Sequence, residues 1–372
     1  MFLTVTSLPH YLVNRGSLRA EDLLDQQVTI AEAGRRNRNF HVRCSRTPGL
    51  FVKQVKAMHV ELQSTVWREA LTLRLSRENA AFAAVAAHAP RLIDYDERRH
   101  TLTTELIADG ENLNDFHRRT GTYPVDVAER TGAALASLHT AGSAMLADPA
   151  AAPFPRALPW VFSVVANIDT TIGAAPDGIK AFVRELQATP EIAVALTELA
   201  ATWHPTVLMH GDVKWDNVIA LGGNAALGGD GTRDVRLVDW ELCDAGEPLW
   251  DVAGALTAYL GAWLFTVPDD PSQPDPVVIA RYTPQPVEAL HPAVGALWQT
   301  YLRDAGASFD GGADATFLRL MRMVGVRFVQ LGFELHAESS VLTQPGLFIA
   351  RLARAFVLDP LATAHDMFGL TP

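Results

Sequence analysis

The eight residues HGDVKWDN, numbered 210–217, place two aspartates, a histidine, a lysine and an asparagine between two apolar segments. The apolar residues 207–209 precede them and residues 218–219 follow, and both segments indicate buried strands. Ionisable groups are costly to bury without partners. We therefore expect these residues either to form a solvated turn or to hold a charged ligand.

The composition indicates a compact chain with more than one lobe. Of 372 residues, 48% are hydrophobic and 20% are charged, and a chain of this length is expected to form two lobes or domains. The net charge of 31 − 42 = −11 argues against a general nucleic-acid binder, whose surface would be basic. The two cysteines, Cys44 and Cys243, form no CxxC or metal-binding pattern, which favours a reducing, cytoplasmic location.

No membrane segment is expected. Residues 1–16 lack the basic start and apolar core of a signal peptide. Residues 252–268 are apolar but contain Gly254 and Gly261, and they are fewer than the roughly 20 residues that a bilayer span needs. We interpret them as a buried helix.

The sequence changes character near residues 107–112. Before this point, residues 28–107 alternate in short segments and contain one stretch of helical spacing, which predicts a small antiparallel sheet with one helix. After it, helical patterns predominate, at 125–139, 178–188, 191–203, 252–264, 294–305 and 315–337. The predicted fold class is α+β, with an N-terminal lobe of residues 1–108 and a helical C-terminal lobe of residues 109–372.

Three oxygen-bearing side chains are expected to converge. A glycine-rich connection at 222–234 separates predicted strands at 218–221 and 235–238, so Asp239 after the second strand can return to Asp212 and Asn217. Carboxylate and amide oxygens suit Mg²⁺, and a carboxylate free of metal can take a proton from a hydroxyl. Phosphoryl transfer needs this combination of a metal on the phosphates and a base on the nucleophile.

The same residues resemble a known family. HGDVKWDN, followed by LVDWE and by GEPLWDVAG at 246–254, is similar to the aminoglycoside phosphotransferase and choline kinase family, which has a bilobal protein-kinase-like fold. The resemblance implies that Asp212 is the catalytic base, that Asn217 and Asp239 are magnesium ligands, and that Lys214 contacts the γ-phosphate.

Two further residues of these motifs have structural roles in the family. The resemblance implies that His210 packs and hydrogen-bonds beneath the catalytic loop, and that Asp251 braces the backbone of that loop. In TGAALASLHTAG, which resembles a family helix ending in Leu-His, we expect His139 to be a packed helix-end residue and not a ligand.

The N-terminal part contains a candidate ion pair. Lys53 interrupts the apolar run LFVKQV, where a lysine is costly unless paired. In the protein-kinase-like fold a strand lysine contacts the α- and β-phosphates and is held by a glutamate of the next helix. The resemblance implies this pair for Lys53 and Glu69, and Glu61, nearer the start of the helix, remains an alternative partner.

Two backbone segments are expected to contact the nucleotide. The turn AEAGRRNRNFHV has one glycine, Gly34, and resembles the sparse phosphate turn of this family, whose backbone N–H groups can cover phosphates. Its arginines would either add positive charge there or be simple surface charge: Arg35, Arg36 and Arg38. The segment TTELIADG resembles the hinge, where backbone groups from Glu105 to Ile107 would bind adenine.

The resemblance therefore implies an ATP- and Mg²⁺-dependent phosphotransferase that moves the γ-phosphate to a hydroxyl of a small molecule of the aminoglycoside or amino-alcohol type. Two alternatives stay open. One is a kinase-like enzyme that phosphorylates Ser or Thr of a precursor peptide and works with a partner protein. The other is a pseudokinase or nucleotide-binding interaction module, although such proteins usually lack the base or a metal ligand and this chain lacks neither. No nucleic-acid or membrane partner is expected.

Overall fold

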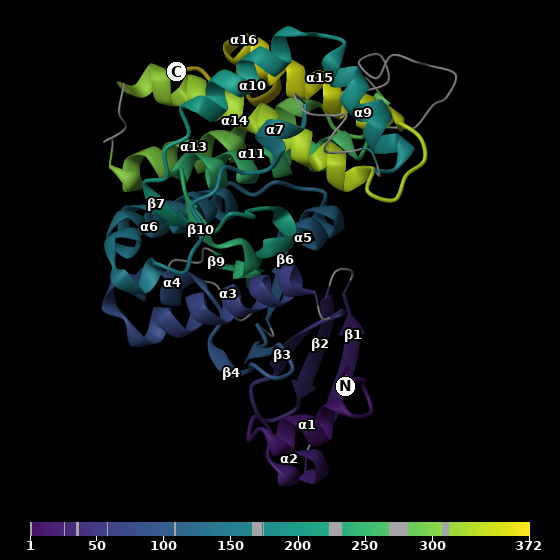
Figure 1. The fold of residues 1–372 in the computed structure, drawn as a ribbon, viewed down its shortest axis with the longest axis vertical. Coiled ribbons are helices and arrows are strands. Elements are labelled where there is room, and N and C mark those ends of the chain that lie inside the picture. Colours follow the sequence, from purple (N-terminus) through teal and green to yellow (C-terminus); the bar gives the residue numbers. More distant parts are fainter. Residues whose placement is uncertain are drawn as a thin grey trace.

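The protein has two lobes, a small one that holds the N-terminus and a larger helical one that holds the C-terminus (Figure 1). The computed structural model describes residues 2–25, 27–34, 37–57, 59–107, 109–165, 173, 175–222, 233–267, 282–306 and 312–372. An antiparallel N-terminal sheet and a helical C-terminal region confirm the predicted α+β class. The lobe boundary between residues 108 and 109 stays a prediction.

The small lobe is built on one antiparallel sheet of five strands. In spatial order these are β1 (Val28–Ala33), β2 (Asn37–Cys44), β3 (Leu50–Val55), β5 (Thr101–Glu105) and β4 (Leu92–Asp96). Side chains alternate along a strand, so Leu50 and Val52 of β3 pack into the cluster under α1 (Leu8–Asn14). Lys53, on the other face of β3, points towards α3 (Val60–Glu78) and the large lobe.

The prediction of a single helix within residues 28–107 was wrong. Besides α3, the structure has the short helix α4 (Ala83–His88), and α1 and α2 (Ala20–Asp25) precede the sheet. Helices this short are marginal on their own and are stabilised by tertiary packing, here by the burial of Val85 from α4 and of Leu8, Tyr11 and Leu12 from α1. Local patterns therefore did not reveal them.

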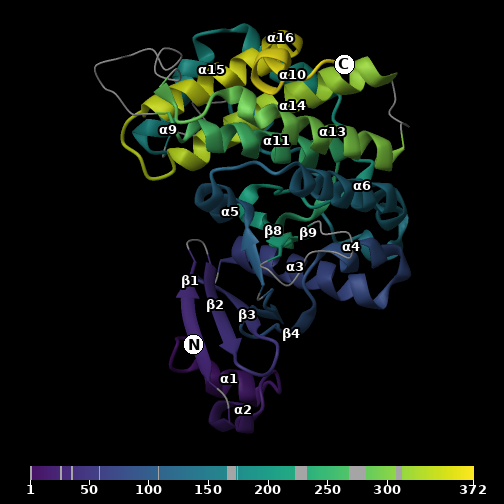
Figure 2. The same cartoon turned by 180° about the vertical axis from the view of Figure 1, so that it is seen from behind.

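The large lobe is helical and is organised around α6, α11, α13, α14 and α15 (Figure 2). Most predicted helices are confirmed within a few residues at each end. In chain order the helices are α5 (Leu113–Thr120), α6 (Val125–Ala147), α7 (Val161–Val164), α9 (Asp177–Gln187), α10 (Glu191–Ala201), α11 (Pro248–Leu264), α13 (His291–Ala305), α14 (Gly312–Leu335), α15 (Gln344–Leu358) and α16 (Pro360–Phe368).

Helix α6 does not end at residue 139, as the sequence predicted, but continues to Ala147. Gly142, which lies in the added part of the helix, allows a close approach between α6 and the strand β7 (Val207–Met209). A Cβ on Gly142 would lie 2.7 Å from the Cβ of Val207. His139 consequently lies within the helix and is buried.

Two small sheets lie at the junction of the lobes and position the loop 210–217 and Asp239. β7 pairs with β10 (Asp244–Gly246), and β6 (Gly110–Asn112) pairs with β8 (Val218–Leu221), which pairs with β9 (Asp234–Leu237). The two predicted strands on either side of the glycine-rich connection are confirmed, while its residues 223–232 lie outside the described part of the chain. The loop 210–217 follows β7, and Asp239 follows β9.

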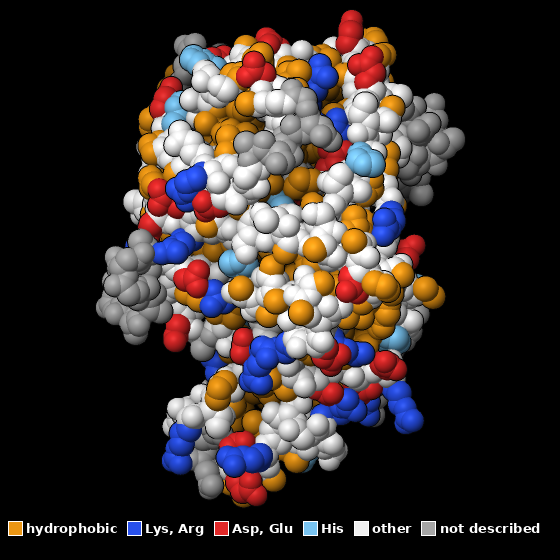
Figure 3. Space-filling model, turned by 90° about the vertical axis from the view of Figure 1, so that its left-hand side faces the viewer, with side chains coloured by type: hydrophobic (Ala, Val, Ile, Leu, Met, Phe, Trp, Pro, Cys, Tyr) orange, Lys and Arg blue, Asp and Glu red, His pale blue; other side chains and the backbone are white. Residues whose placement is uncertain are grey.

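The surface carries both signs of charge. On the face shown in Figure 3, the described Lys and Arg side chains are interspersed with Asp and Glu, so no broad field of one sign covers it. Among the helices that the structure describes, none has both the length and the apolar character that crossing a membrane would require.

Candidate active site

Hydrogen bonds from the first turn of α11 fix the backbone of the loop 210–217. Asp251 accepts hydrogen bonds from the backbone N–H of His210 at 2.8 Å and of Gly211 at 2.9 Å. Trp250 donates its Nε1–H to the carbonyl of Gly211 at 3.1 Å. His210 lies 3.0 Å from the carbonyl oxygen of Val238 through Nε2. These contacts join the loop to the strand end that carries Asp239, and they match the bracing expected of His210 and Asp251.

Asp212 is buried in the centre of this loop, and its two carboxylate oxygens have different surroundings. Oδ2 lies 2.9 Å from the Lys214 ammonium and accepts a hydrogen bond from Asn217 Nδ2 at 3.1 Å. Oδ1 is buried and no described residue donates a hydrogen bond to it; Arg327 Nη2 is 3.9 Å away. Burial opposes ionisation of Asp212, but Lys214 and Arg327 outweigh it and lower the pKa of the carboxyl.

Lys53 lies at the meeting point of three carboxylates. Its Nζ is 2.6 Å from Glu69 Oε2, 3.3 Å from Glu241 Oε2, and also hydrogen-bonded to Asp239 Oδ1. Burial disfavours the ammonium, but Asp239, Glu69 and Glu241 together raise the pKa of Lys53 above its usual value. Glu61 is exposed in the first turn of α3, so the partner of Lys53 on that helix is Glu69.

The donor set around Asp239 fits a divalent cation. Glu69, Asp239 and Glu241 each offer a carboxylate oxygen within 4.8 Å of the others, and with one lysine among them their formal charge is −3 + 1 = −2. Asn217 donates its amide N–H groups to Asp212, so its amide oxygen is left to accept. Hard oxygen ligands of this kind suit Mg²⁺. Asp239 itself has φ 66°, in the left-handed region that is uncommon for non-glycine residues.

A cavity of about 420 Å³ lies between the lobes and contains most of the predicted nucleotide-site residues. Lys53, Glu69 and Glu105 to Ile107 line it from the small lobe, and Asn217 and Asp239 line it from the large lobe. The Glu105 carboxylate accepts a hydrogen bond from the Arg91 N–H at 2.9 Å. The side chain of Glu105 is thus engaged at the rim, and the binding of adenine by backbone groups from Glu105 to Ile107 stays a prediction.

Gly34 is not among the residues that line this cavity, and its carbonyl accepts a hydrogen bond from Lys56 Nζ at 3.1 Å. The turn reaches the site through Asn37, which donates to Glu241 Oε2 at 3.1 Å. Of the three arginines of this turn, Arg35 and Arg36 lie outside the described residues. Arg38 forms an ion pair with Glu32 at 2.8 Å on the surface of the sheet, which supports the reading of Arg38 as surface charge.

A second, smaller cavity of about 190 Å³ adjoins the first, and Asp216 lines both. Lys214 and Arg327 line the second cavity as well, whereas Asn217 lines the first. All three side chains lie next to Asp212, which itself is buried and lines neither cavity. The remaining walls come from α5, the catalytic loop, α11 and α14: Asn114, Trp215, Gly254, Thr257, Ala258, Gly261, Ala262, Phe265, Gln330, Leu331 and Glu334.

Three residues near these cavities were not predicted from the sequence: Glu241, Arg327 and Glu334. Glu241 was visible in the quoted LVDWE, where it follows the predicted metal ligand by two residues. Arg327 and Glu334 lie on α14, whose sequence indicates only a helix. Arg327 is buried, donates to the Val213 carbonyl at 3.1 Å and stacks over Trp250, with its guanidinium carbon 4.9 Å from the ring centroid.

The two-lobed fold and these loops define a protein-kinase-like phosphotransferase. Residues 27–290 match the family model described as the phosphotransferase enzyme family, and the chain belongs to that family. The protein is accordingly an ATP-dependent phosphotransferase. A comparison with curated proteins gives no match.

Solved structures share this fold at low sequence identity. A choline/ethanolamine kinase family protein from Mesorhizobium loti aligns with a TM-score of 0.55 and 16% identity, covering 96% of each chain. A choline kinase from Streptococcus pneumoniae aligns with a TM-score of 0.50 and 12% identity, covering 94% of this chain and 98% of that one. At such identities the likeness establishes the fold.

Proposed function

We propose that the protein transfers the γ-phosphate of ATP, with Mg²⁺, to a hydroxyl of a small amine-bearing molecule of the amino-alcohol or amino-sugar type. The observation that carries this proposal is the position of Asp212. Its Oδ1 is buried without a hydrogen-bond donor among the described residues, and it faces Arg327, which lines the smaller cavity. A hydroxyl of an acceptor in that cavity is the donor that Oδ1 lacks.

The reaction follows from this arrangement. Asp212 orients the acceptor hydroxyl and takes its proton as the hydroxyl oxygen bonds to the γ-phosphorus, and the bond from that phosphorus to the β–γ bridging oxygen breaks to release ADP. Lys53 holds the α- and β-phosphates, and Lys214 leaves Asp212 Oδ2 to contact the γ-phosphate. Asn217 and Asp239 would hold Mg²⁺, which supplies charge neutralisation on the phosphate oxygens. Preorganised charge of this kind provides much of the rate in phosphoryl transfer.

The size and the charge of the smaller cavity support a small, cationic acceptor. Its volume of about 190 Å³ is below the roughly 300–1,000 Å³ typical of sites for drug-sized ligands. Glycine and alanine residues of α11 form one wall, and Asp216 and Glu334 bring negative charge to the exposed rim. An ammonium group at this rim, with a hydroxyl reaching Asp212, fits both features better than a peptide does.

The proposal is tested by a screen of possible acceptors, in which both ATP consumption and the phosphorylated product are measured. The purified protein with ATP and Mg²⁺ is offered choline, ethanolamine, glucosamine, kanamycin, glycerol and a Ser/Thr peptide, and ³¹P NMR identifies the phosphomonoester. We expect transfer to one of the small amines and loss of transfer in Asp212→Asn. Glu334→Gln should raise the KM of that amine about two- to fivefold, as for an exposed ion pair, while the exposed Glu338→Gln should leave it unchanged. Transfer to the peptide alone would overturn the proposed acceptor class.

A further inference from the structure

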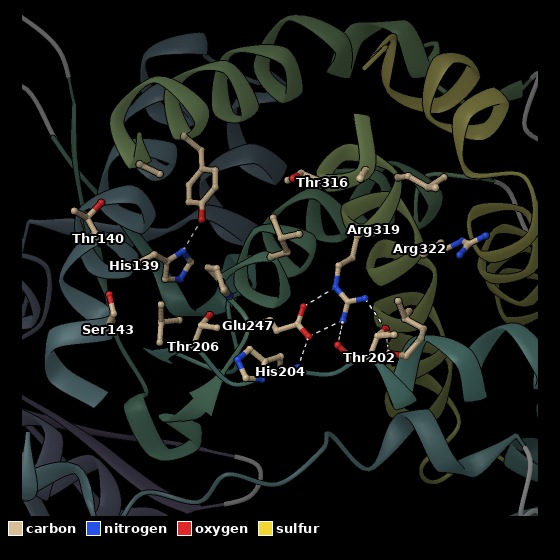
Figure 4. Close-up of a pocket in the computed structure, with 18 of the residues that line it drawn as sticks. His139, Thr140, Ser143, Thr202, His204, Thr206, Glu247, Thr316, Arg319 and Arg322 are labelled. Carbon is tan, nitrogen blue, oxygen red and sulfur yellow. Dashed lines mark hydrogen bonds and ion pairs between the residues drawn. The ribbon is translucent and has the colours of Figure 1, made fainter. Parts of the chain in front are cut away.

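A third cavity lies in the large lobe, apart from the proposed transfer site. We call it the rear cavity; residues of α6, α10, α11, α13 and α14 surround a volume of about 800 Å³ (Figure 4). It shares no lining residue with the nucleotide cavity or with the smaller cavity beside Asp212. Its floor is buried and includes His139, Tyr301 and Glu247, whereas rim residues such as Thr140 and Ser143 are exposed.

One wall of the rear cavity is a fixed ion pair whose charges satisfy each other. Arg319 donates from Nε and Nη2 to the two carboxylate oxygens of Glu247, at 2.7 and 2.6 Å, as Figure 4 shows. Arg319 also donates to the hydroxyl and the carbonyl of Thr202, and the N–H of His204 donates to Glu247 at 2.7 Å. This ion pair forms one wall of the cavity. Because Arg319 and Glu247 neutralise each other, neither is expected to bind a charged ligand strongly.

One donor that lines the rear cavity lacks an acceptor among the described residues. Arg322 has a buried Nε–H for which no described residue is an acceptor. An unsatisfied buried donor of this kind favours an acceptor from outside the chain. Figure 4 shows Thr140 and Ser143 on one side of the cavity and Arg322 on the other. This arrangement suits a molecule with an anionic group at one end and hydroxyls at the other.

The floor of the rear cavity connects to the catalytic loop through two side chains. His139 lies 3.2 Å from Asp251 Oδ2 through Nε2 and 3.0 Å from the Tyr301 hydroxyl through Nδ1. Because a carboxylate only accepts, Nε2–H donates to Asp251, and Nδ1 forms the hydrogen bond with the Tyr301 hydroxyl. Asp251 in turn accepts the backbone N–H groups of His210 and Gly211. A ligand against Tyr301 therefore acts on the residue that braces the Asp212 loop.

We propose that the rear cavity binds a small hydroxylated organic anion, such as a sugar phosphate or a sugar acid, and that its occupancy alters phosphate transfer through Tyr301, His139 and Asp251. The binding part does not depend on the proposed function, whereas the effect on transfer rests on it. The anionic group of the ligand pairs with Arg322, and its hydroxyls form hydrogen bonds with Thr140 and Ser143 at the rim.

Calorimetry on the protein without nucleotide tests the binding part. The probes are glucose 6-phosphate, gluconate, glucose and inorganic phosphate, which separate phosphate from carboxylate and the anion from the hydroxyls. We expect one of the two hydroxylated anions to bind more tightly than glucose or phosphate. Arg322→Gln should weaken that binding about ten- to a hundredfold, the range for a charge-assisted hydrogen bond. The matched control Arg303→Gln removes an exposed arginine of α13 that does not line the cavity and should leave binding unchanged. Absence of binding by both anions, or equal binding in Arg322→Gln, would overturn the proposal.

The rate of ADP release, measured at saturating concentrations of ATP and of the acceptor, tests the effect of the anion on phosphate transfer. Addition of the binding anion should change the rate in wild type at least twofold, and the change should disappear in Tyr301→Phe while calorimetry still detects the anion. An unchanged wild-type rate with the anion bound, or an equal change in Tyr301→Phe, would refute the connection through His139. A protein that binds the anion but transfers phosphate to none of the tested acceptors would instead refute the proposed function and leave the site intact.

Discussion

The three carboxylates around Lys53 predict that Glu69→Gln destabilises the wild-type protein but not the Lys53→Met variant. The Lys53 side chain is 4% exposed, and those of Glu69 and Glu241 are 4% and 7% exposed. Lys53→Met leaves three carboxylates close together with no cation, and breaking a buried ion pair typically costs about 3–5 kcal/mol. We expect this loss of unfolding free energy, because the acidic groups must then repel each other or take up protons.

Glu69→Gln is a milder change in wild type. Lys53 keeps Asp239 and Glu241, and the amide oxygen of Gln can still accept the Trp240 N–H that Glu69 accepts at 3.3 Å. A loss of about 1–2 kcal/mol is expected, close to the value of a hydrogen bond to a charged group. In the Lys53→Met background the same substitution removes one of three repelling charges, so it should be neutral or stabilising.

Equilibrium urea unfolding at pH 7, without nucleotide or magnesium, measures all four proteins of this cycle. The losses of unfolding free energy in the two single variants, added together, should exceed the loss in the double variant by about 1–3 kcal/mol. This is the usual coupling between residues of one charge network. Lys180→Met is the matched control, since Lys180 is half-buried and its ion-pair partner Asp177 on α9 is exposed, and such a surface pair should be worth less than about 1 kcal/mol. If Glu69→Gln costs the same in both backgrounds, the carboxylates do not share the lysine and the charge argument fails.

Three further predictions concern the catalytic loop and its surroundings. Asp212→Ala should still be stabilised thermally by Mg-ATP, by about 2.7 kcal/mol at a hundredfold excess over Kd, while transfer falls about 10²–10⁴-fold. Asp239→Ala should lose the magnesium-dependent part of that thermal shift, and equal shifts in both variants would contradict the two assignments. Burial lowers the pKa of His117 to about 4, so the unfolded chain takes up a proton near pH 6.5 and the folded one does not. The unfolding free energy should therefore fall by up to about 3 kcal/mol between pH 6.5 and 4, and His117→Phe, measured by urea unfolding across this range, should flatten the decline. Arg327→Met leaves the buried Val213 carbonyl without its donor and should destabilise the protein by about 1–3 kcal/mol; a kcat equal to that of wild type would argue against a role for Arg327 beside Asp212.

The sequence was informative where the chemistry is local. Asp212, Lys214 and Asn217 lie within one short loop, and Asp239 follows a strand whose partner β8 starts at the end of that loop. Lys53 was visible because a lysine in an apolar strand needs a partner. Whether Glu69 or Glu61 is its partner depends only on which side of α3 is turned towards the sheet. In each case a costly polar group stood in an apolar pattern, and that contrast is detectable without coordinates.

Residues whose role depends on packing between distant helices gave no such signal. Arg327 lies in a helix of mixed composition, where an arginine usually indicates an exposed position. Its burial depends on Trp250 and on the carbonyl of Val213, both far away in sequence. His139 was expected at a helix end, and its contacts with Tyr301 and Asp251 depend on how α6 packs against α13 and α11.

Gly254 explains how a charged side chain can occupy that position next to the catalytic loop. It lies on α11 opposite Arg327, and a Cβ there would lie 2.4 Å from the Val213 carbonyl oxygen and 2.9 Å from Arg327 Nη2. Any larger residue would therefore displace the guanidinium from the carbonyl that it binds. The small residue of α11 and the arginine of α14 thus specify one arrangement together, although neither is informative alone. Because the same wall of α11 bounds the smaller cavity, the packing that admits Arg327 also sets the room left for an acceptor beside Asp212.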